Sequence, residues 1–173
     1  PLAKIDANRS SYEAEEKYAE ARAAAINNAV QTQWRNKCID STYEPGSTFK
    51  PCTAIAALES GVTTTSEKIR DTGLWYYPDM IAGTEPFTAW CWNHAGHGLQ
   101  NVTQAITNSC NTYFMEMGYR MGLDTLNEYY SAFGLGEPTG IEIGENTGSQ
   151  AVNENGQDQA PWAAFGQANQ EYT

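Results

Sequence analysis

The sequence has few basic residues and no long hydrophobic run. Ten Lys and Arg stand against 21 Asp and Glu, which gives a net charge of −11 and a pI near 4.5. Such a surface repels phosphate backbones and anionic headgroups, so we expect neither nucleic acid nor an anionic membrane surface as a partner. The longest aliphatic run, Ala54–Leu58, is far shorter than the roughly 20 residues that a membrane-spanning helix needs.

The sequence also has few cysteines and no visible signal peptide. Four cysteines in 173 residues are too few for a disulfide scaffold, and we expect four free thiols. No signal peptide is visible at Pro1–Lys4, and the sequence stops abruptly at Gln170–Thr173. We therefore expect a piece of a longer protein, whose membrane anchor would lie outside these residues.

The remaining composition, 40% hydrophobic and 18% charged, is that of a globular domain. Helical periodicity and propensity predict a first helix over residues 10–35. One buried side of this helix would consist of Tyr18, Ala21, Ala25, Val30 and Trp34. A second helix should run from Ser47 to Ser60, ended by Gly61.

The rest of the chain alternates loops with short elements. Residues 62–100 indicate a loop-rich stretch with short strands at most. Ile141–Ile143 alternates like an edge strand, and residues 144–173 look irregular. Further helical segments are predicted at Val102–Asn108, Thr112–Met121 and Leu123–Phe133, with a helical turn near Pro161–Phe165.

Ser47 and Lys50 form the pattern S-x-x-K at the start of the second predicted helix. Residues i and i+3 share a helical face, so the two side chains would lie together. The helix dipole would favour developing negative charge on the serine oxygen. If burial lowers the lysine pKa from its usual value of roughly 10.4, the neutral amine can take the serine proton. The pair has the layout of an acylable nucleophile, although the pattern alone is weak evidence.

A second polar pattern, Ser109-Cys110-Asn111, interrupts an otherwise helical stretch. A polar break between two helices can aim a hydroxyl and an amide into a cleft, although an ordinary interhelical turn has the same composition. The tight entry Pro45-Gly46 and the apolar helix after Lys50 favour a buried setting for the S-x-x-K pair. The candidate site residues are therefore Ser47, Lys50, Ser109 and Asn111.

Together these motifs resemble those of the class B penicillin-binding proteins, the division and sporulation transpeptidases. Active-site serine enzymes of this kind carry S-x-x-K, then S-x-N, then K-[ST]-G. Tyr43–Pro51 resembles the nucleophile segment of the family, and Asn108–Asn111 with the preceding Gly96–Gly98 resembles its second motif region. The resemblance runs from about residue 35 to the end. On this view residues 1–36 are a variable helical insertion and residues 37–173 the motif-bearing region.

The resemblance implies a serine-type peptidoglycan D,D-transpeptidase. Ser47 would attack the penultimate D-alanine carbonyl of a D-Ala-D-Ala stem peptide, with Lys50 as the base. Ser109 would relay a proton to the leaving amine, and Asn111 would hold Lys50 and the substrate amide. A neighbouring stem's amine would then attack the acyl-enzyme and form the cross-link. β-Lactam antibiotics would acylate the same serine as substrate mimics.

The sequence departs from this family pattern in one respect. None of its lysines (Lys4, Lys17, Lys37, Lys50 and Lys68) heads a K-[ST]-G. In the family this third motif lies on a sheet-edge strand and provides half of the oxyanion hole. We therefore expect a mostly α chain, the helical subdomain of the α/β serine transpeptidase (β-lactamase-like) fold with most of the sheet missing. Such a fragment would acylate poorly or not at all.

The resemblance also implies partners and a location. The parent protein would act at the extracytoplasmic face of a bacterial cell membrane, held by an N-terminal anchor, beside other division or sporulation wall-synthesis proteins. It would need no cofactor. A β-lactamase fits less well, because no residue is an evident deacylating glutamate. The rival from another class is a non-catalytic module, either a β-lactam sensor or a division-complex scaffold, that keeps the motifs without turnover.

Cysteine and histidine gather in one further segment. Cys91, His94 and His97 form a C-x2-H-x2-H run that, together with Cys110, can be interpreted as a zinc site. Cys91 and Cys110 can instead be interpreted as a reversible disulfide, which would distort the S-x-N turn. We favour inert packed thiols without a metal ion, with Trp90 and Trp92 as packing anchors of this loop.

Overall fold

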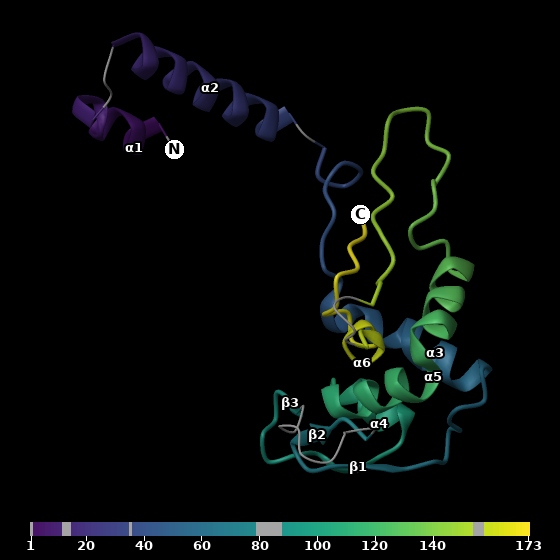
Figure 1. The fold of residues 1–173 in the computed structure, drawn as a ribbon. Helices are drawn as coiled ribbons and strands as arrows, with labels where there is room; N and C mark the ends of the chain where they lie inside the picture. The colour runs from purple at the N-terminus through teal and green to yellow at the C-terminus, as the bar shows by residue number, and fades with distance from the viewer. Residues whose placement is uncertain (1, 12–14, 35, 79–87, 154–157) are drawn as a thin grey trace. The chain divides into compact units, whose positions relative to one another are not determined.

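The computed structural model describes residues 2–11, 15–34, 36–78, 88–153 and 158–173 (Figure 1). The chain divides into two compact units, residues 1–41 and residues 42–173. Within the described ranges, no helix combines the length and the apolar character that a membrane crossing requires. The predicted boundary between residues 36 and 37 stays a prediction.

The first unit is built from helices joined by polar contacts. Its elements are α1 (Leu2–Ala7), a 3₁₀ turn η1 (Arg9–Ser11) and α2 (Glu15–Trp34). The helix predicted over residues 10–35 is confirmed over Glu15–Trp34; residues 10 and 11 belong to η1, and residues 12–14 and 35 lie outside the described ranges. Its predicted buried side is wrong, because no residue of α2 is buried and Trp34 is 85% exposed. The short α1 offers little apolar surface. Its Asp6 carboxylate instead accepts hydrogen bonds from Tyr18 (2.7 Å) and Arg22 (3.2 Å) of α2.

Helices of the second unit follow the sequence predictions closely. The predicted helix Ser47–Ser60 begins as a 3₁₀ turn and continues as an α-helix, and Gly61 follows it with φ +75°. The two helices predicted on either side of Gly122 form one element with non-helical dihedrals at that glycine (φ 73°, ψ 165°). The helices are η2 (Gly46–Phe49), α3 (Lys50–Glu59), α4 (Val102–Thr107), α5 (Asn111–Ala132) and α6 (Ala160–Ala163).

Four short strands lie in the described part of the loop-rich stretch, at the end of this unit near α4 (Figure 1). They form two separate antiparallel pairs, β1 with β4 and β2 with β3. The predicted edge strand at Ile141–Ile143 is wrong: these residues form no strand, and both isoleucines are exposed. Alternation makes a strand only where a neighbour completes the hydrogen-bond ladder. The strands are β1 (Ile69–Asp71), β2 (Leu74–Tyr76), β3 (Thr88–Trp90) and β4 (Gly98–Gln100).

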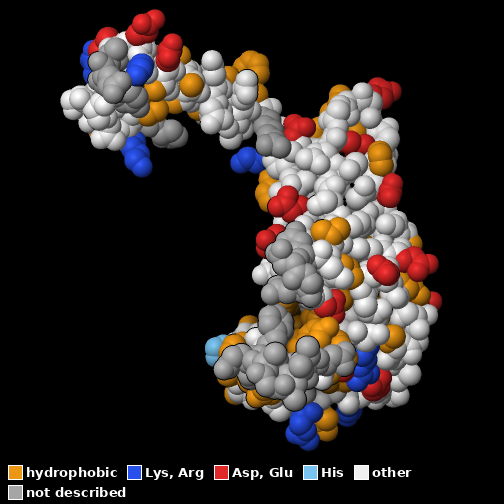
Figure 2. All heavy atoms as spheres, viewed as in Figure 1, with side chains coloured by type: hydrophobic (Ala, Val, Ile, Leu, Met, Phe, Trp, Pro, Cys, Tyr) orange, Lys and Arg blue, Asp and Glu red, His pale blue; other side chains and the backbone are white. Residues whose placement is uncertain are grey.

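The core of the second unit centres on α5, which packs against α3 and α6. Tyr113, Phe114, Met117 and Tyr130 of α5 are each at most 1% exposed. Acidic side chains are spread over the visible face of this unit, and its few Lys and Arg side chains lie near the end with the short strands (Figure 2). The chain is thus helix-rich with only short strands, as predicted, and the helices α3 and α5 carry the two polar motifs into one core.

Candidate active site

Ser47 and Lys50 lie together at the junction of η2 and α3. The Lys50 amine is 3.0 Å from the Ser47 hydroxyl. Ser47 is exposed, whereas Lys50 is only 2% exposed. A hydrogen bond to the segment after α6 stabilises the turn that carries Ser47: the Gly46 N–H donates to the Gly166 carbonyl at 2.9 Å. A Cβ on Gly166 would approach the Gly46 oxygen to 2.3 Å, so only glycine permits this contact.

The Lys50 amine also reaches the second motif. It donates to the Ser109 carbonyl (2.8 Å), the Ser109 hydroxyl (2.9 Å) and the Asn111 side-chain oxygen (2.6 Å). An ammonium has three N–H donors, and here all of them find oxygen acceptors. The structure thus brings together all four predicted site residues, Ser47, Lys50, Ser109 and Asn111, around one buried amine.

The surroundings of Lys50 favour its neutral form. Burial lowers the pKa of Lys50 to about 8, although the nearby thiols of Cys91 and Cys110 act in the opposite direction. The rings of Phe114 and Phe165 lie 5.8 Å and 5.9 Å from the amine and keep water from it. An amine with this pKa is neutral in an appreciable fraction of molecules near neutral pH and can then accept the Ser47 proton. Sequence reasoning missed both rings, since an aromatic residue in a helical stretch has no distinguishing pattern.

The Ser109 backbone is bent into a rare conformation. Among the residues that the structure describes, Ser109 alone combines a side chain with a positive φ (50°). Its N–H donates to the Ile106 carbonyl at 3.0 Å and so ends α4, while α5 begins two residues later at Asn111. The left-handed conformation of Ser109 turns the chain sharply, so that the Ser109 hydroxyl and the Asn111 side-chain amide both face the Lys50 amine.

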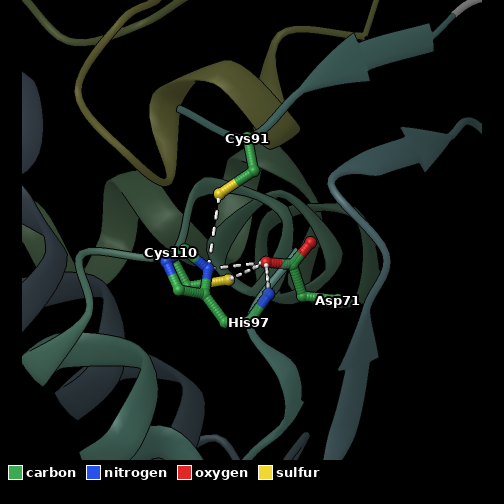
Figure 3. Close-up of side chains that lie close together, drawn as sticks. All are labelled: Asp71, Cys91, His97 and Cys110. Atoms are coloured by element: carbon green, nitrogen blue, oxygen red, sulfur yellow. Dashed lines mark hydrogen bonds and ion pairs between the residues drawn. The ribbon is translucent and has the colours of Figure 1, made fainter. Parts of the chain in front are cut away.

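A second cluster of polar side chains lies behind this turn. Figure 3 shows Asp71, Cys91, His97 and Cys110 pointing toward one another, with one ligating atom of each within 4.8 Å of the others. The sequence indicated Cys91, His97 and Cys110, but His94 is not part of the cluster, and its ring packs on Trp90 at 4.9 Å. Asp71 was missed, because a single aspartate at a strand end carries no motif.

Burial and hydrogen bonds together shift the pKa values of this cluster. Burial alone would raise the pKa of Asp71, but hydrogen bonds from the Gly73 N–H, Thr112 and His97 outweigh it and lower the pKa to about 2. Burial raises the pKa of the Cys110 thiol to about 12. All four cysteines of the chain have free thiols in the structure. The packed thiols that we favoured for Cys91 and Cys110 agree with this state, and a reversible disulfide between them remains an untested alternative.

The tryptophans of this loop differ from the prediction. Trp90 is 54% exposed and Trp92 is 63% exposed, so neither is a packing anchor. The buried tryptophan is Trp75 on β2, whose indole N–H donates to Glu116 at 3.0 Å. A two-stranded sheet buries one face only, and Trp90 lies on the other.

Comparison with known proteins identifies the fold and its relatives. Residues 6–173 match the family model of the penicillin binding protein transpeptidase domain. The chain is 42% identical over 115 residues to Stage V sporulation protein D of Bacillus subtilis, covering 66% of this chain and 17% of that protein. It is 35% identical over 122 residues to the peptidoglycan D,D-transpeptidase MrdA of Escherichia coli, covering 70% of this chain and 18% of that protein.

Solved structures agree with this comparison. An imipenem acyl-enzyme complex of penicillin-binding protein A from M. tuberculosis superposes with a TM-score of 0.72 at 26% identity, over 94% of this chain and 36% of that one. The chain therefore spans less than a fifth of the curated relatives it matches and about a third of this solved structure.

Proposed function

This chain belongs to the penicillin binding protein transpeptidase domain family, and on that premise we propose that the whole protein is a serine-type peptidoglycan D,D-transpeptidase. The observation that carries the proposal is the position of the Lys50 amine. It lies within 3.0 Å of oxygens of Ser47, Ser109 and Asn111, and it is almost fully buried. A buried amine between two hydroxyls can move protons from one to the other.

Acylation begins at Ser47. Its oxygen forms a bond to the penultimate D-alanine carbonyl carbon of a stem peptide, and its proton passes to the neutral Lys50 amine. When the tetrahedral intermediate collapses, the carbon–nitrogen bond to the terminal D-alanine breaks. Ser109 passes a proton to the leaving amine, and Lys50 replaces it. The Ser47 backbone N–H donates to the oxyanion, and Asn111 holds the substrate amide.

Transpeptidation completes the cycle. The amine of a neighbouring stem attacks the ester carbonyl, and its proton passes through Ser109 to the neutral Lys50 amine. When the bond to the Ser47 oxygen breaks, Lys50 returns this proton to the serine. β-Lactams follow the first half of this course, because their strained amide takes the place of the D-alanyl amide. The relative from M. tuberculosis, whose structure is an imipenem acyl-enzyme complex, supports this part of the proposal.

The 173 residues do not contain the family's third motif. The sequence has no K-[ST]-G, so the second oxyanion donor and the carboxylate-binding strand must come from outside these residues. We infer that this chain alone acylates poorly or not at all. The whole protein would act at the extracytoplasmic face of a bacterial membrane, together with other wall-synthesis proteins of division or sporulation.

Labelling with a fluorescent penicillin tests the proposal. In the whole protein we expect one label per molecule, located on Ser47 by peptide mass, and none in Ser47→Ala. Ser66→Ala is the control, because Ser66 is an exposed serine outside both motifs, and this variant should be labelled to the same extent as the parent. A label on another residue, or persistence of labelling in Ser47→Ala, would refute the assignment. With a D-Ala-D-Ala peptide in place of the penicillin, an acyl-enzyme that never transfers to an added amine would instead favour a β-lactam sensor without turnover.

A further inference from the structure

A buried hydroxyl that the proposed reaction does not use ties α3 to the end of α6. Thr53 lies one helical turn after Lys50 on α3 and is fully buried. Its hydroxyl is 2.6 Å from the Ala164 carbonyl and 2.8 Å from the Tyr130 hydroxyl. A carbonyl can only accept, so the Thr53 proton goes to Ala164 and Tyr130 donates to Thr53.

The Ala164 carbonyl lies where the chain turns back after α6. The N–H groups of Gly166 and Gln167 donate into the last turn of α6, each at 3.0 Å, and form a Schellman motif. Gly166 has the left-handed φ (78°) that this motif requires. Ala164 is fully buried, so its carbonyl needs a hydrogen-bond donor, and the Thr53 hydroxyl supplies one.

The two residues after Ala164 are the ones that reach the active site. The Phe165 ring lies 5.9 Å from the Lys50 amine. The Gly166 carbonyl accepts the Gly46 N–H at 2.9 Å, in the turn that carries Ser47. The position of this short segment therefore affects both the nucleophile and the surroundings of its base.

We propose that Thr53 is a positioning residue for acylation and that it acts through the segment Ala164–Gly166. This inference rests on the proposed role of Ser47 as the nucleophile. The Thr53 hydroxyl fixes the segment on α3, the helix that also carries Lys50. A misplacement of about 1 Å can cost ~10²-fold in rate, so a loosened segment would slow the attack although every reacting group remained.

The hydrogen bonds at the end of α6 single out Thr53. The Ala163 carbonyl accepts from two donors, the Gly166 N–H at 3.0 Å and the Gln170 side-chain amide at 2.9 Å, so loss of one leaves the other. The Ala164 carbonyl instead accepts the Thr53 hydroxyl, at the shorter distance of 2.6 Å. Removal of this hydroxyl should therefore loosen the segment more than removal of the Gln170 amide.

Thr53→Val and Thr53→Ser in the whole protein test the proposal. Valine keeps the branched shape without the hydroxyl, whereas serine keeps the hydroxyl and loses a buried methyl group. Stopped-flow acylation by a labelled penicillin separates its dissociation constant from the rate constant of the covalent step. In Thr53→Val we expect that rate constant to fall ~10–100-fold with the dissociation constant unchanged. Thr53→Ser should restore the rate constant to near the parent value.

Thr63→Val is the matched control. Thr63 is also a buried threonine whose hydroxyl lies near a tyrosine of α5, at 3.4 Å from Tyr113, but its second partner is Glu67 (3.0 Å). This variant should lose stability and acylate at the parent rate. If the rates of all three variants simply followed their stabilities in urea, Thr53 would have a structural role only, and the proposal would be wrong.

Gly166→Ala gives a second test in case Thr53→Val does not fold. The added Cβ would approach the Gly46 oxygen to 2.3 Å, so the same rate constant should fall. Gly140→Ala is its control, because Gly140 has a similar φ of 80° and nothing within 4 Å of its added Cβ. A parent-like rate constant in Thr53→Val or Gly166→Ala, with the label on Ser47, would overturn only the role of Thr53. A label on another residue of the parent would instead refute the proposed function.

Discussion

The Lys50 amine lies 3.0 Å from the Ser47 hydroxyl because a 3₁₀ turn joins the two residues. In a 3₁₀ helix the side chains at i and i+3 eclipse, so lysine stands directly behind serine. The Lys50 N–H closes this turn on the Ser47 carbonyl, and α3 begins at Lys50 itself. The junction therefore exposes the nucleophile while it buries the base.

Removal of the Lys50 amine tests its role as the base. In Lys50→Met of the whole protein we expect the acylation rate with a labelled penicillin to fall by ~10²–10⁴-fold, the range for a lost general base. Lys68→Met is the matched control, because Lys68 is exposed and it should acylate at the parent rate. Circular dichroism of both variants checks the fold. An unchanged rate in Lys50→Met would assign the proton transfer to another group.

The protonation of Lys50 should be visible directly. Burial lowers its pKa from 10.5 to about 8, so its charge is lost at a pH where ordinary lysines keep theirs. Carbon-13 labelling of the five lysines should show one ε-carbon titrating near pH 8, absent in Lys50→Arg. Acylation, which needs the neutral amine, should rise over the same range. A midpoint above pH 10 for this signal would contradict the assignment.

The same shift has a consequence for stability. Between pH 8 and pH 10.5 the unfolded chain binds the Lys50 proton more than the folded chain does. The contribution of this residue to the free energy of unfolding should therefore rise with pH across that window and be least favourable below pH 8. Urea titrations of the parent and Lys50→Met at several pH values should show a difference that changes in this direction.

Close packing of α5 on α6 predicts a sensitive glycine. A Cβ on Gly118 would meet the Ala160 carbonyl oxygen at 2.3 Å and the Ala164 Cβ at 2.7 Å. Gly118→Ala should therefore cost at least ~1–3 kcal/mol, seen as a lower urea midpoint. Gly144→Ala is the control, since nothing lies within 4 Å of its added Cβ. Equal midpoints for the two variants would mean that the helices do not pack this closely.

The parts of the molecule that could be predicted are those with local signals. Spacing alone placed Ser47 with Lys50, and motif order added Ser109 and Asn111. Helix ends followed local chemistry too, as at Gly61.

Features that depend on distant partners could not be predicted. Asp71 joins the cysteines only because β1 pairs with β4 and brings the end of the strand beside the first turn of α5. The exposure of Trp90 and Trp92 and the failure of the Ile141–Ile143 strand have the same origin. Each of these features depends on which other part of the fold covers the residue. The hydrophobic periodicity of the sequence does not contain that information.

Ser109 tests whether backbone conformation and side-chain chemistry can be separated. The Ser109 Oγ accepts a hydrogen bond from the Lys50 amine at 2.9 Å. The backbone φ of 50° raises the conformational free energy of any residue that has a Cβ. Ser109→Ala loses the acceptor and keeps the strain, whereas Ser109→Gly loses the acceptor and relieves the strain. After the entropic cost of glycine, we expect the Gly variant to be more stable than the Ala variant by ~1 kcal/mol in urea unfolding.

Both variants lack the hydroxyl, so both should slow acylation of the whole protein by a similar factor, ~10²–10⁴-fold if Ser109 relays the proton. Each variant is therefore the control for the other. An Ala variant as stable as the Gly variant would contradict the left-handed backbone at Ser109. Parent-like acylation in both variants would not contradict the left-handed backbone, but it would remove Ser109 from the proton path. Water would then donate the proton to the leaving amine equally well.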